Sequence, residues 1–298
     1  MKTSIITREL VQTIIGKRRR EIHKGDCGRV LIAAGSAGMA GAAVIAARAA
    51  LRSGSGLVQV AIPAELFPII QTGVPEATCL ERDFSKLDLG RFDAAAAGPG
   101  LEKGEESVSF VKELIRRFDG TLVIDADGLN IVAEHGLFRE LRSRRPAATV
   151  ITPHAGEAAR LLAAAGKAEA AGKAASGGEE DRLQTARLLH ELTGAVAVLK
   201  GHGTLVAVND EETYINTTGN PGMATAGAGD ALTGVIVSLA GQHKAIVGRI
   251  TAAEAAAAGV FIHGMAGDLA AQSTGEYGLL ATDIAYFTAM ALKELTGC

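Results

Sequence analysis

The sequence predicts an α/β protein with a mostly parallel central sheet covered by helices on both faces. Short, continuously apolar runs, which are typical of strands buried on both faces, alternate with longer segments of helical composition. Hydrophobic residues make up 48% of the 298-residue chain and charged residues 21%, which is enough apolar material for a sizeable core. Aromatic residues are only 4% and Trp is absent, so the core must consist mainly of Ala, Val, Ile and Leu, with close backbone contacts at Gly and Ala.

The elements follow in order along the chain. The apolar runs predict strands at 29–35, 56–62, 92–98, 121–127, 148–153 and 195–201. Most of the segments between them predict helices, at 39–53, 103–118, 128–142, 155–165 and 181–193. Residues 204–217 (TLVAVND followed by EETYINT) predict a hairpin around Asn209–Glu212, and the Ala-rich remainder from about Ala228 is predicted to be helical.

Two segments need a separate interpretation. Residues 163–180 are low in complexity, and we expect an exposed helix extension or a flexible insertion within a single domain, 1–298. Residues 30–47 carry no charge and approach the length of a membrane span. Glycines interrupt their middle, however, which favours a strand, a loop and a helix, so no membrane association is expected.

Charge and cysteine content exclude several classes of protein. The net charge of −3 gives no general attraction to nucleic acid or to an anionic membrane. We therefore interpret the basic run KRRREIHK, residues 17–24, as a solvated segment or as cations near an anionic ligand. Cys27, Cys79 and Cys298 have no CxxC spacing and predict neither a disulfide framework nor a zinc site. The N-terminus lacks an apolar core of signal-peptide length, and a reducing cytoplasm is expected.

The ends of the apolar runs predict a ligand cleft. They finish in Gly, Asp, His or Lys, and in open parallel sheets ligands bind beyond the carboxyl ends of the strands. Two common phosphate-binding motifs are absent. The chain has no GxxxxGK[ST], and GSAGMAG at residues 35–41 has GxxGxxG spacing rather than the GxGxxG of dinucleotide-binding dehydrogenases.

Asp230 is the only charged residue in NTTGNPGMATAGAGDALTG, residues 216–234. Gly227, Ala228 and Gly229 lack bulk, so their amides can converge at the start of a helix and form an anion site. A carboxylate beside a bound phosphate would be repelled unless it took a proton from a hydroxyl attacking that phosphate. The alternative is that Asp230 merely caps the helix. The glycine-rich setting favours the functional interpretation.

Three other strand ends carry candidate groups. The amides of LKGHGT (199–204) can hold a nucleotide phosphate beside Lys200, or the segment is a tight turn with a solvated lysine. His154 in TPHAGE can hydrogen-bond a substrate, although satisfying the local backbone is the simpler interpretation. Asp125 and Asp127 can attract Mg²⁺ directly or through water, although a turn at Asp127–Gly128 is the simpler interpretation.

Together these stretches resemble the ADP- or ATP-dependent NAD(P)H-hydrate dehydratases, which have the three-layer ribokinase-like fold. Matching stretches occur in family order from about His23 to Asp283, and NPGMAT is the most specific of them. They are HKGDCGRVLIAAGSAGMAGAAVIAARAALRSGSGLV, AAGPGL, LVIDADGLN, TPHAGEAARLL, AVLKGHGT, NPGMATAGAGDALTGV and HGMAGDLAA…GEYGLLATD.

The resemblance implies a repair reaction on the S epimer of NADH or NADPH hydrate. The enzyme would phosphorylate the ring hydroxyl with ADP, or less often ATP, in the presence of Mg²⁺, and then eliminate phosphate. Asp230 would be the catalytic base, with an anion hole at Ala226, Gly227, Ala228 and Gly229. The nucleotide would contact Lys200, Gly201, His202, Gly203, Thr204 and Gly229. The hydrate would contact Ala42 or Ala43, Gly100, His154 and Asp230, with Asp125, Asn220 and Met223 as auxiliary candidates.

The resemblance also implies a tetramer and a functional partnership with a separate NAD(P)H-hydrate epimerase. The chain departs from the family pattern at four positions, because the family commonly has TPHPGE where Ala155 stands, GGTGD where Ala226 and Ala228 stand, and Ala at His202. Two alternatives stay open. One is a small-molecule kinase of the same fold acting on a thiazole or pyrimidine alcohol, and the other is a non-catalytic nucleotide-binding protein.

Overall fold

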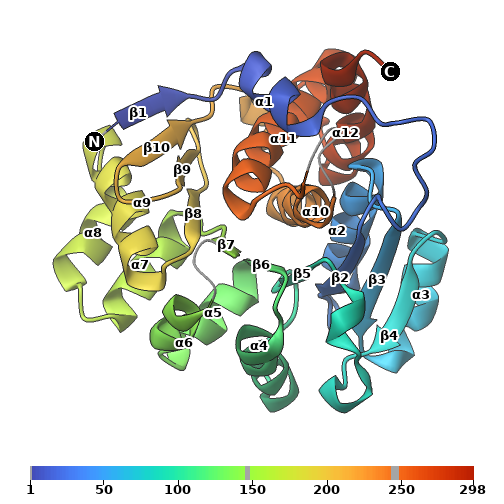
Figure 1. Cartoon of the computed structure of the whole chain (residues 1–298). Helices are drawn as coiled ribbons and strands as arrows, with labels where there is room; N and C mark the ends of the chain where they lie inside the picture. Colours follow the sequence, from blue (N-terminus) through green and yellow to red (C-terminus); the bar gives the residue numbers. More distant parts are fainter. Residues whose placement is uncertain (1, 145–147, 243–247) are drawn as a thin grey trace.

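The computed structural model describes residues 2–144, 148–242 and 248–298 (Figure 1). The strands of the described residues form one ten-stranded sheet in the order β1-β10-β9-β8-β7-β6-β5-β2-β3-β4. Strand β9 is antiparallel to both of its neighbours, and the other pairs are parallel. The strands are β1 (Lys2–Ile5), β2 (Arg29–Ala33), β3 (Leu57–Ile62), β4 (Thr78–Glu81), β5 (Ala94–Ala97), β6 (Thr121–Ile124), β7 (Thr149–Ile151), β8 (Val196–Leu199), β9 (Leu205–Ala207) and β10 (Glu212–Ile215).

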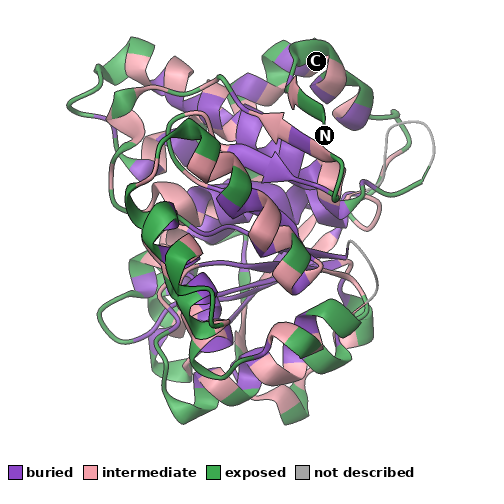
Figure 2. Ribbon diagram, turned by 90° about the vertical axis from the view of Figure 1, so that its left-hand side faces the viewer, coloured by how far each residue is buried: buried purple, intermediate pink, exposed green. Residues whose placement is uncertain are grey.

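Helices cover both faces of the sheet, and the predicted α/β class is confirmed (Figure 1). One face packs against α1 (Arg8–Ile15), α2 (Ala40–Arg52), α3 (Phe67–Gly73), α10 (Ala228–Gly241), α11 (Ala252–Thr274) and α12 (Ala281–Thr296). The other packs against α4 (Glu105–Arg117), α5 (Ala126–Glu134), α6 (Phe138–Ser143), α7 (Ala155–Ala164), α8 (Ala168–Ser176) and α9 (Glu179–Thr193). Each face therefore has its own apolar core, and Figure 2 shows the buried sheet between the two helical layers.

Two sequence predictions need correction. The single helix expected at 128–142 is two helices, α5 and α6, because the chain turns at Gly136 with φ +63°. The low-complexity segment, residues 163–180, contains a helix of its own instead of an extension of α7. Helix α7 ends before Gly166, whose φ is +76°, and α8 is a separate helix that buries Ala171 and Ala174.

The residues expected at 30–47 to form a strand, a loop and a helix do so, as β2 and α2. Among the helices of the described ranges, none combines the length and apolarity that crossing a bilayer requires. The hairpin is confirmed as β9 and β10.

The sheet brings the predicted cleft together at one edge. Strands β2, β5, β6, β7 and β8 run parallel, so their carboxyl ends lie on the same side. Helix α10 lies against β5 and β6 and touches α2 backbone to backbone, since a Cβ on Gly234 would overlap the Ala46 carbonyl oxygen. This contact fixes the N-terminus of α10 relative to the strand ends.

Candidate active site

The N-terminus of α10 forms most of the predicted anion site. Gly227 precedes the helix with φ +89°, a conformation that favours glycine, and a Cβ there would lie 2.7 Å from the Ile45 side chain. The amides of Gly229 and Asp230 donate to no carbonyl in the described part of the chain. The Ala228 amide instead donates to the Thr225 carbonyl at 3.3 Å. The other predicted amides, those of Ala226, Gly227 and Gly229, donate to no carbonyl in the described ranges, and the Asp230 amide adds a further open donor.

Asp230 does not cap its helix, because the cap position is Gly227. Its side chain faces a cluster of charged groups from three other elements. Lys200, directly after β8, places Nζ 2.6 Å from Oδ1 of Asp125 and 3.6 Å from Oε2 of Glu157. The backbone of Gly229 lies against the same cluster, since a Cβ there would be 3.3 Å from Nζ of Lys200.

Asp125 ties the cluster to α10. It follows β6 and is only 1% exposed. Its Oδ1 accepts from Lys200, and its Oδ2 accepts from Oγ1 of Thr233 at 2.8 Å. Thr233 lies three residues after Asp230, on the same face of α10. A buried carboxylate with both oxygens satisfied in this way positions Asp230 and Lys200 relative to each other.

The cluster sets the charge of Asp230. Burial, followed by the charges of Asp125 and Glu157, raises the pKa of its carboxyl, Lys200 opposes them, and the result is a pKa of about 7. For Lys200, burial acts to lower the pKa, but Asp125, Glu157 and Asp230 outweigh it and the pKa is raised. Near pH 7 the site therefore holds an ammonium group and a carboxyl group that exchanges its proton readily.

His263 of α11 supports the first turn of α10. Its Nε2 lies 2.9 Å from the Ala228 carbonyl oxygen, which can only accept, so Nε2 carries the hydrogen. Burial lowers the pKa of this imidazole to about 4, even though the bond to Ala228 favours the charged form. A neutral ring thus holds the turn without adding charge beside Lys200.

His154 satisfies the local backbone, as the simpler interpretation predicted. Its Nδ1 accepts from the amides of Gly156 and Glu157 at 3.0 and 3.4 Å, and Oε2 of Glu157 accepts from the His154 amide at 2.8 Å. This reciprocal capping box begins α7 and places Glu157 near Lys200. The ring is 53% exposed, so it also presents a surface to a ligand.

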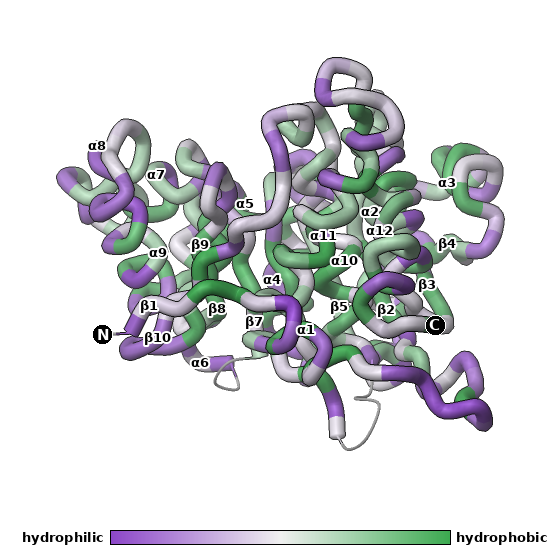
Figure 3. Tube along the Cα trace, turned by 90° about the horizontal axis from the view of Figure 1, so that it is seen from above, coloured by the Kyte–Doolittle hydropathy of each residue, from purple (hydrophilic) through white to green (hydrophobic). Residues whose placement is uncertain are grey.

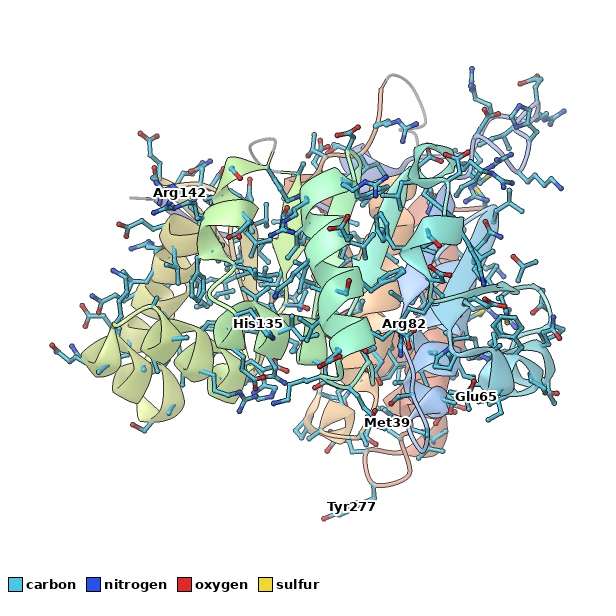
Figure 4. All side chains as sticks on the ribbon, turned by 90° about the horizontal axis from the view of Figure 1, so that it is seen from below. Met39, Glu65, Arg82, His135, Arg142 and Tyr277 are labelled. Atoms are coloured by element: carbon cyan, nitrogen blue, oxygen red, sulfur yellow. The ribbon has the colours of Figure 1, made fainter. Side chains whose placement is uncertain are left out.

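Two of the predicted hydrate contacts lie side by side. Gly100 has φ +58°, and a Cβ there would lie 3.0 Å from Cβ of Ala42 and 2.9 Å from the Met39 carbonyl oxygen. Ala43 is fully buried, so of the predicted pair only Ala42 can present its side chain to a ligand. In Figure 4, Tyr277, which is fully exposed, projects from the molecule beyond Met39.

Side chains that the sequence did not single out fix the loops after β2 and β5. Ser36 donates from Oγ to the Gly100 carbonyl at 2.8 Å. Arg82, directly after β4, donates from Nη1 to the Gly35 carbonyl at 2.9 Å and is 7% exposed (Figure 4). These bonds join the carboxyl ends of β2, β4 and β5 into one wall.

The predicted nucleotide loop is built on two glycines with positive φ, +141° at Gly201 and +60° at Gly203. Oγ1 of Thr204 donates to the Gly201 carbonyl at 2.9 Å. Arg182 of α9 donates to the carbonyl of His202, whose side chain is exposed. Lys200 itself points into the carboxylate cluster, so it is not the solvated lysine of a simple turn.

The auxiliary candidates Asn220 and Met223 hold the loop before α10. Nδ2 of Asn220 donates to Oδ1 of Asp268 at 3.0 Å, and the Gly219 amide donates to Oδ2 of the same carboxylate at 2.9 Å. Met223 packs so closely on Gly267 of α11 that a Cβ there would overlap its sulfur. These contacts attach the NPGM segment to α11.

The carboxylates considered for Mg²⁺ are occupied by protein donors. Oδ2 of Asp127 accepts from the Glu102 amide at 2.9 Å and Oδ1 from Asn130 at 3.2 Å, and both oxygens of Asp125 are bonded as described above. No group of three His, Cys, Asp or Glu side chains suited to a metal ion occurs in the described ranges.

Within those ranges, Glu102 and Ala126 are the non-glycine residues with positive φ, +61° and +47°, so backbone strain is concentrated beside Asp125 and Asp127.

Comparison with known proteins gives the family. The sequence model of the NAD(P)H-hydrate dehydratase family (Carb_kinase) matches residues 30–288. The chain belongs to this family. It is 37% identical to the ADP-dependent (S)-NAD(P)H-hydrate dehydratase of Neisseria meningitidis serogroup B, over 93% of the chain and 91% of that protein.

Other members of the NAD(P)H-hydrate dehydratase family are similar over the same region. The bifunctional NAD(P)H-hydrate repair enzyme Nnr of Moorella thermoacetica is 39% identical over 98% of the chain but only 54% of that protein, so the chain spans about half its length. A crystal structure of the ADP/ATP-dependent NAD(P)H-hydrate dehydratase from Bacillus subtilis, co-crystallised with ATP and Mg²⁺, matches with a TM-score of 0.83 and 27% identity, covering 99% of each chain. The ribokinase-like fold is thereby confirmed.

Three of the four departures from the dehydratase pattern, Ala155, Ala226 and Ala228, lie at positions that tolerate them. Ala155 is the first residue of α7, where proline would only restrict the backbone. Ala226 is exposed and precedes the helix cap, while Ala228 uses its amide and carbonyl for Thr225 and His263. The glycines on either side of Ala228 are kept, and with them the open amides at Gly229 and Asp230.

Proposed function

We propose that the chain dehydrates the S epimer of NADH or NADPH hydrate, with ADP in preference to ATP as phosphoryl donor. The observation that carries this proposal is Asp230, whose pKa lies near 7 at a helix N-terminus with open amides, where the charge of Lys200 acts on it. Membership of the dehydratase family and the similarity to the Neisseria enzyme support the same reaction.

The proposed chemistry has two steps. The ring hydroxyl of the hydrate attacks the terminal phosphorus of the nucleotide, its proton passes to Asp230, and the bond between phosphorus and the leaving nucleotide oxygen breaks. The C–O bond of the phosphorylated hydrate then breaks, phosphate leaves with the bonding electrons, and a neighbouring carbon loses a proton. The ring double bond is restored, and nucleotide and inorganic phosphate are released.

The residues around Asp230 divide this work. The amides of Gly229 and Asp230 and the dipole of α10 stabilise negative charge on the transferring phosphoryl group. Lys200 supplies a positive charge beside it, and the loop from Gly201 to Thr204 holds the nucleotide. Ala42, Gly100 and the exposed ring of His154 line the position of the hydrate.

Mg²⁺ enters this proposal with the nucleotide. The described residues do not form a protein metal cage, and Mg²⁺ is commonly held by substrate phosphates and water with one or two carboxylates. Asp125 and Asp127 contribute at most through water, because protein donors occupy their oxygens.

The proposal extends to the cellular setting. We expect a cytoplasmic enzyme that acts as a tetramer and works with an NAD(P)H-hydrate epimerase, which supplies the S epimer. The relatives described as bifunctional combine two activities in one longer chain, which supports such a partnership.

A turnover assay tests the proposed function. Purified protein is incubated with Mg²⁺ and S-NADH hydrate, with ADP and ATP in separate reactions, and NADH absorbance and free phosphate are followed together. We expect NADH and phosphate to appear in equal amounts, faster with ADP. Nucleotide consumption on a thiazole or pyrimidine alcohol with no NADH formed would assign the chain to the kinases. Tight nucleotide binding without any turnover would assign it to the non-catalytic class.

A further inference from the structure

A cavity of about 290 Å³ lies at the opposite end of α10 from Asp230. Helix α10 connects the two places, because its first turn carries Asp230 and its C-terminal residues Leu239 and Gln242 line this cavity. Leu239 and Gln242 follow Asp230 by 9 and 12 residues, so at about 1.5 Å per residue they lie ~14–18 Å from it along the helix. The segment after α1 and the C-terminal end of α12 lie side by side here (Figures 1 and 3).

Apolar side chains from four parts of the chain line the cavity. Ile15 comes from the end of α1, Leu239 from α10, Ile250 from the segment before α11 and Leu292 from α12. Leu239 and Ile250 are buried and belong to the core on this face of the sheet. Its volume is close to the lower limit of about 300–1,000 Å³ for small-molecule sites.

Positive charge surrounds this apolar surface. Arg18, Arg19, Arg52 and Lys293 line the cavity, and in the described ranges no Asp or Glu side chain does. Figure 3 shows the segment after α1 as a hydrophilic stretch.

Two of these cations, Arg18 and Arg52, already make contacts within the protein. Arg18 donates to the Gly54 carbonyl and to Oε1 of Gln242, and Arg52 lies over the Tyr286 ring at 5.1 Å. The Arg18 bonds lie at the C-terminal ends of α2 and α10, where a cation is favourable. Arg19 and Lys293, by contrast, have exposed side chains without a hydrogen-bond or ion-pair partner in the described part of the chain. Two positive charges therefore remain beside an apolar cavity.

We propose that this cavity binds a small amphipathic anion. A carboxylate or phosphate group lies between Arg19 and Lys293, and a short apolar body lies against Ile15, Ile250 and Leu292. Arg19, which belongs to the basic run at residues 17–24, would thus bind an anionic ligand. The proposed site is separate from the nucleotide cleft.

Isothermal titration calorimetry on the whole chain tests this proposal with defined probes. Octanoate and octyl phosphate carry the required anion and apolar body, octylamine reverses the charge, and acetate lacks the body. We expect saturable binding of octanoate or octyl phosphate at one site per chain, and none of octylamine or acetate. The stronger of the two anions identifies the head group. Equal binding of octylamine, or no saturable binding of either anion, overturns the proposal.

Variants locate the binding site. The double variant Arg19→Gln/Lys293→Gln should weaken binding of the tighter anion about five-fold or more. Arg20→Gln is the matched control, because Arg20 is also exposed and carries the same charge but does not line the cavity, and it should leave affinity unchanged. All three positions are exposed, so folding is retained, as circular dichroism would verify. Equal affinity of the double variant and the wild type would place any binding elsewhere and refute the assignment.

Discussion

The surroundings of Asp230 disfavour its ionised form, because burial and the carboxylates of Asp125 and Glu157 all raise its pKa. An ordinary aspartate would be ionised at pH 7 but would be a weak base. The raised pKa makes Asp230 a stronger base while a substantial fraction stays deprotonated near neutral pH. Lys200 is the group in the described ranges that opposes the shift, so we expect the two side chains together to set the pH at which Asp230 can act as a base.

The first prediction concerns pH. Asp230 must be deprotonated to accept the hydroxyl proton, so kcat/KM should rise with pH through an apparent pKa near 7 and level off above it. The measurement is initial NADH formation from pH 5 to 9 at fixed Mg²⁺ and nucleotide. A profile already flat from pH 5 upward would mean that another group is the base.

The second prediction is that Asp230→Asn separates activity from stability. Turnover should fall by about 10²–10⁴-fold, because the amide cannot accept the proton, while nucleotide binding persists. Stability should rise. The folded pKa of about 7 lies above the ordinary 3.8, so ionisation destabilises the folded wild type progressively between these values and fully above them.

The size of this stabilisation depends on pH in a defined direction. A pKa shift of about three units corresponds to a gain in unfolding free energy of at most ~4 kcal/mol for Asp230→Asn at pH 8. At pH 4.5 the expected gain is much smaller. Urea unfolding of both proteins at the two pH values measures it. A variant that gains nothing at pH 8, or gains more at pH 4.5, contradicts the proposed environment of Asp230.

The third prediction concerns Lys200→Met. Without the ammonium, the buried carboxylates of Asp125 and Glu157 lose their counter-charge, and the free energy of unfolding should fall by about 3–5 kcal/mol. The pKa of Asp230 should also rise, since Lys200 lowers it, so any residual activity should shift to higher pH. Lys173→Met is the matched control, because its pair with Glu169 is exposed on α8 and should leave unfolding unchanged.

The sequence predicted some members of this site and missed others for a physical reason. Lys200 and His154 follow apolar runs, and Asp230 stands between a glycine-rich loop and an apolar run, so local composition marks all three. Thr233 and His263 act only through contacts from helices that the fold brings together. The local signal for Thr233 was its spacing of three residues from Asp230 on one helix, whereas His263 lies on another helix and had no such signal.

Helix α7 shows how the first turn of a helix can also hold part of a charge cluster. Its capping box uses His154 and Glu157, and the same Glu157 carboxylate lies 3.6 Å from Lys200. The start of the helix and the charge cluster therefore share one side chain. A change at the cap should reach the active site through the position of Glu157.

The fourth prediction separates capping from ligand binding at His154. His154→Ala removes the acceptor for two amides and should cost about 1 kcal/mol of unfolding free energy, whereas His154→Asn keeps a capping oxygen and should cost little. If the ring also contacts the hydrate, KM should rise in both variants. Chemical unfolding measures the cost of losing the cap, and steady-state kinetics on the same preparations measure KM. An unchanged KM in His154→Asn would restrict His154 to the capping role.

At the level of elements, strands with continuous apolar runs and clear boundaries were predictable from the sequence. Elements with a short or interrupted apolar pattern were not. The buried strands β2, β5, β6 and β8 have continuous apolar runs, and all four were predicted. Strand β4 has the sequence TCLE and lies at the edge of the sheet, where its residues are mostly half-buried or exposed, so it lacks such a run. The division of α5 from α6 depends on one glycine turn within a pattern that otherwise continues.

On the scale of the whole molecule, one sheet joins two apolar cores. The strands send alternate side chains into each core, so neither core can lose its packing without exposing the other face. The charge cluster adds a link, since Asp125, Glu157 and Lys200 from one half meet Thr233 and Asp230 of α10.

The fifth prediction follows for unfolding. Both cores should unfold in one cooperative transition, and saturating nucleotide should shift it as a whole, by about 2.7 kcal/mol at 100 times the Kd. Hydrogen exchange of amides in α5 and α11, which cover opposite faces, measures the two cores separately. Different unfolding free energies for the two helices would show that the chain behaves as more than one domain.

The contact of Gly234 with Ala46 has a consequence for temperature. A gap filled by side chains can adjust through rotamer changes as a protein warms, but two backbones already in contact have no rotamers between them. The distance from Asp230 to the loop after β2 should therefore change little with heating. Loss of activity at high temperature should then coincide with unfolding and not precede it as a gradual loosening of the site.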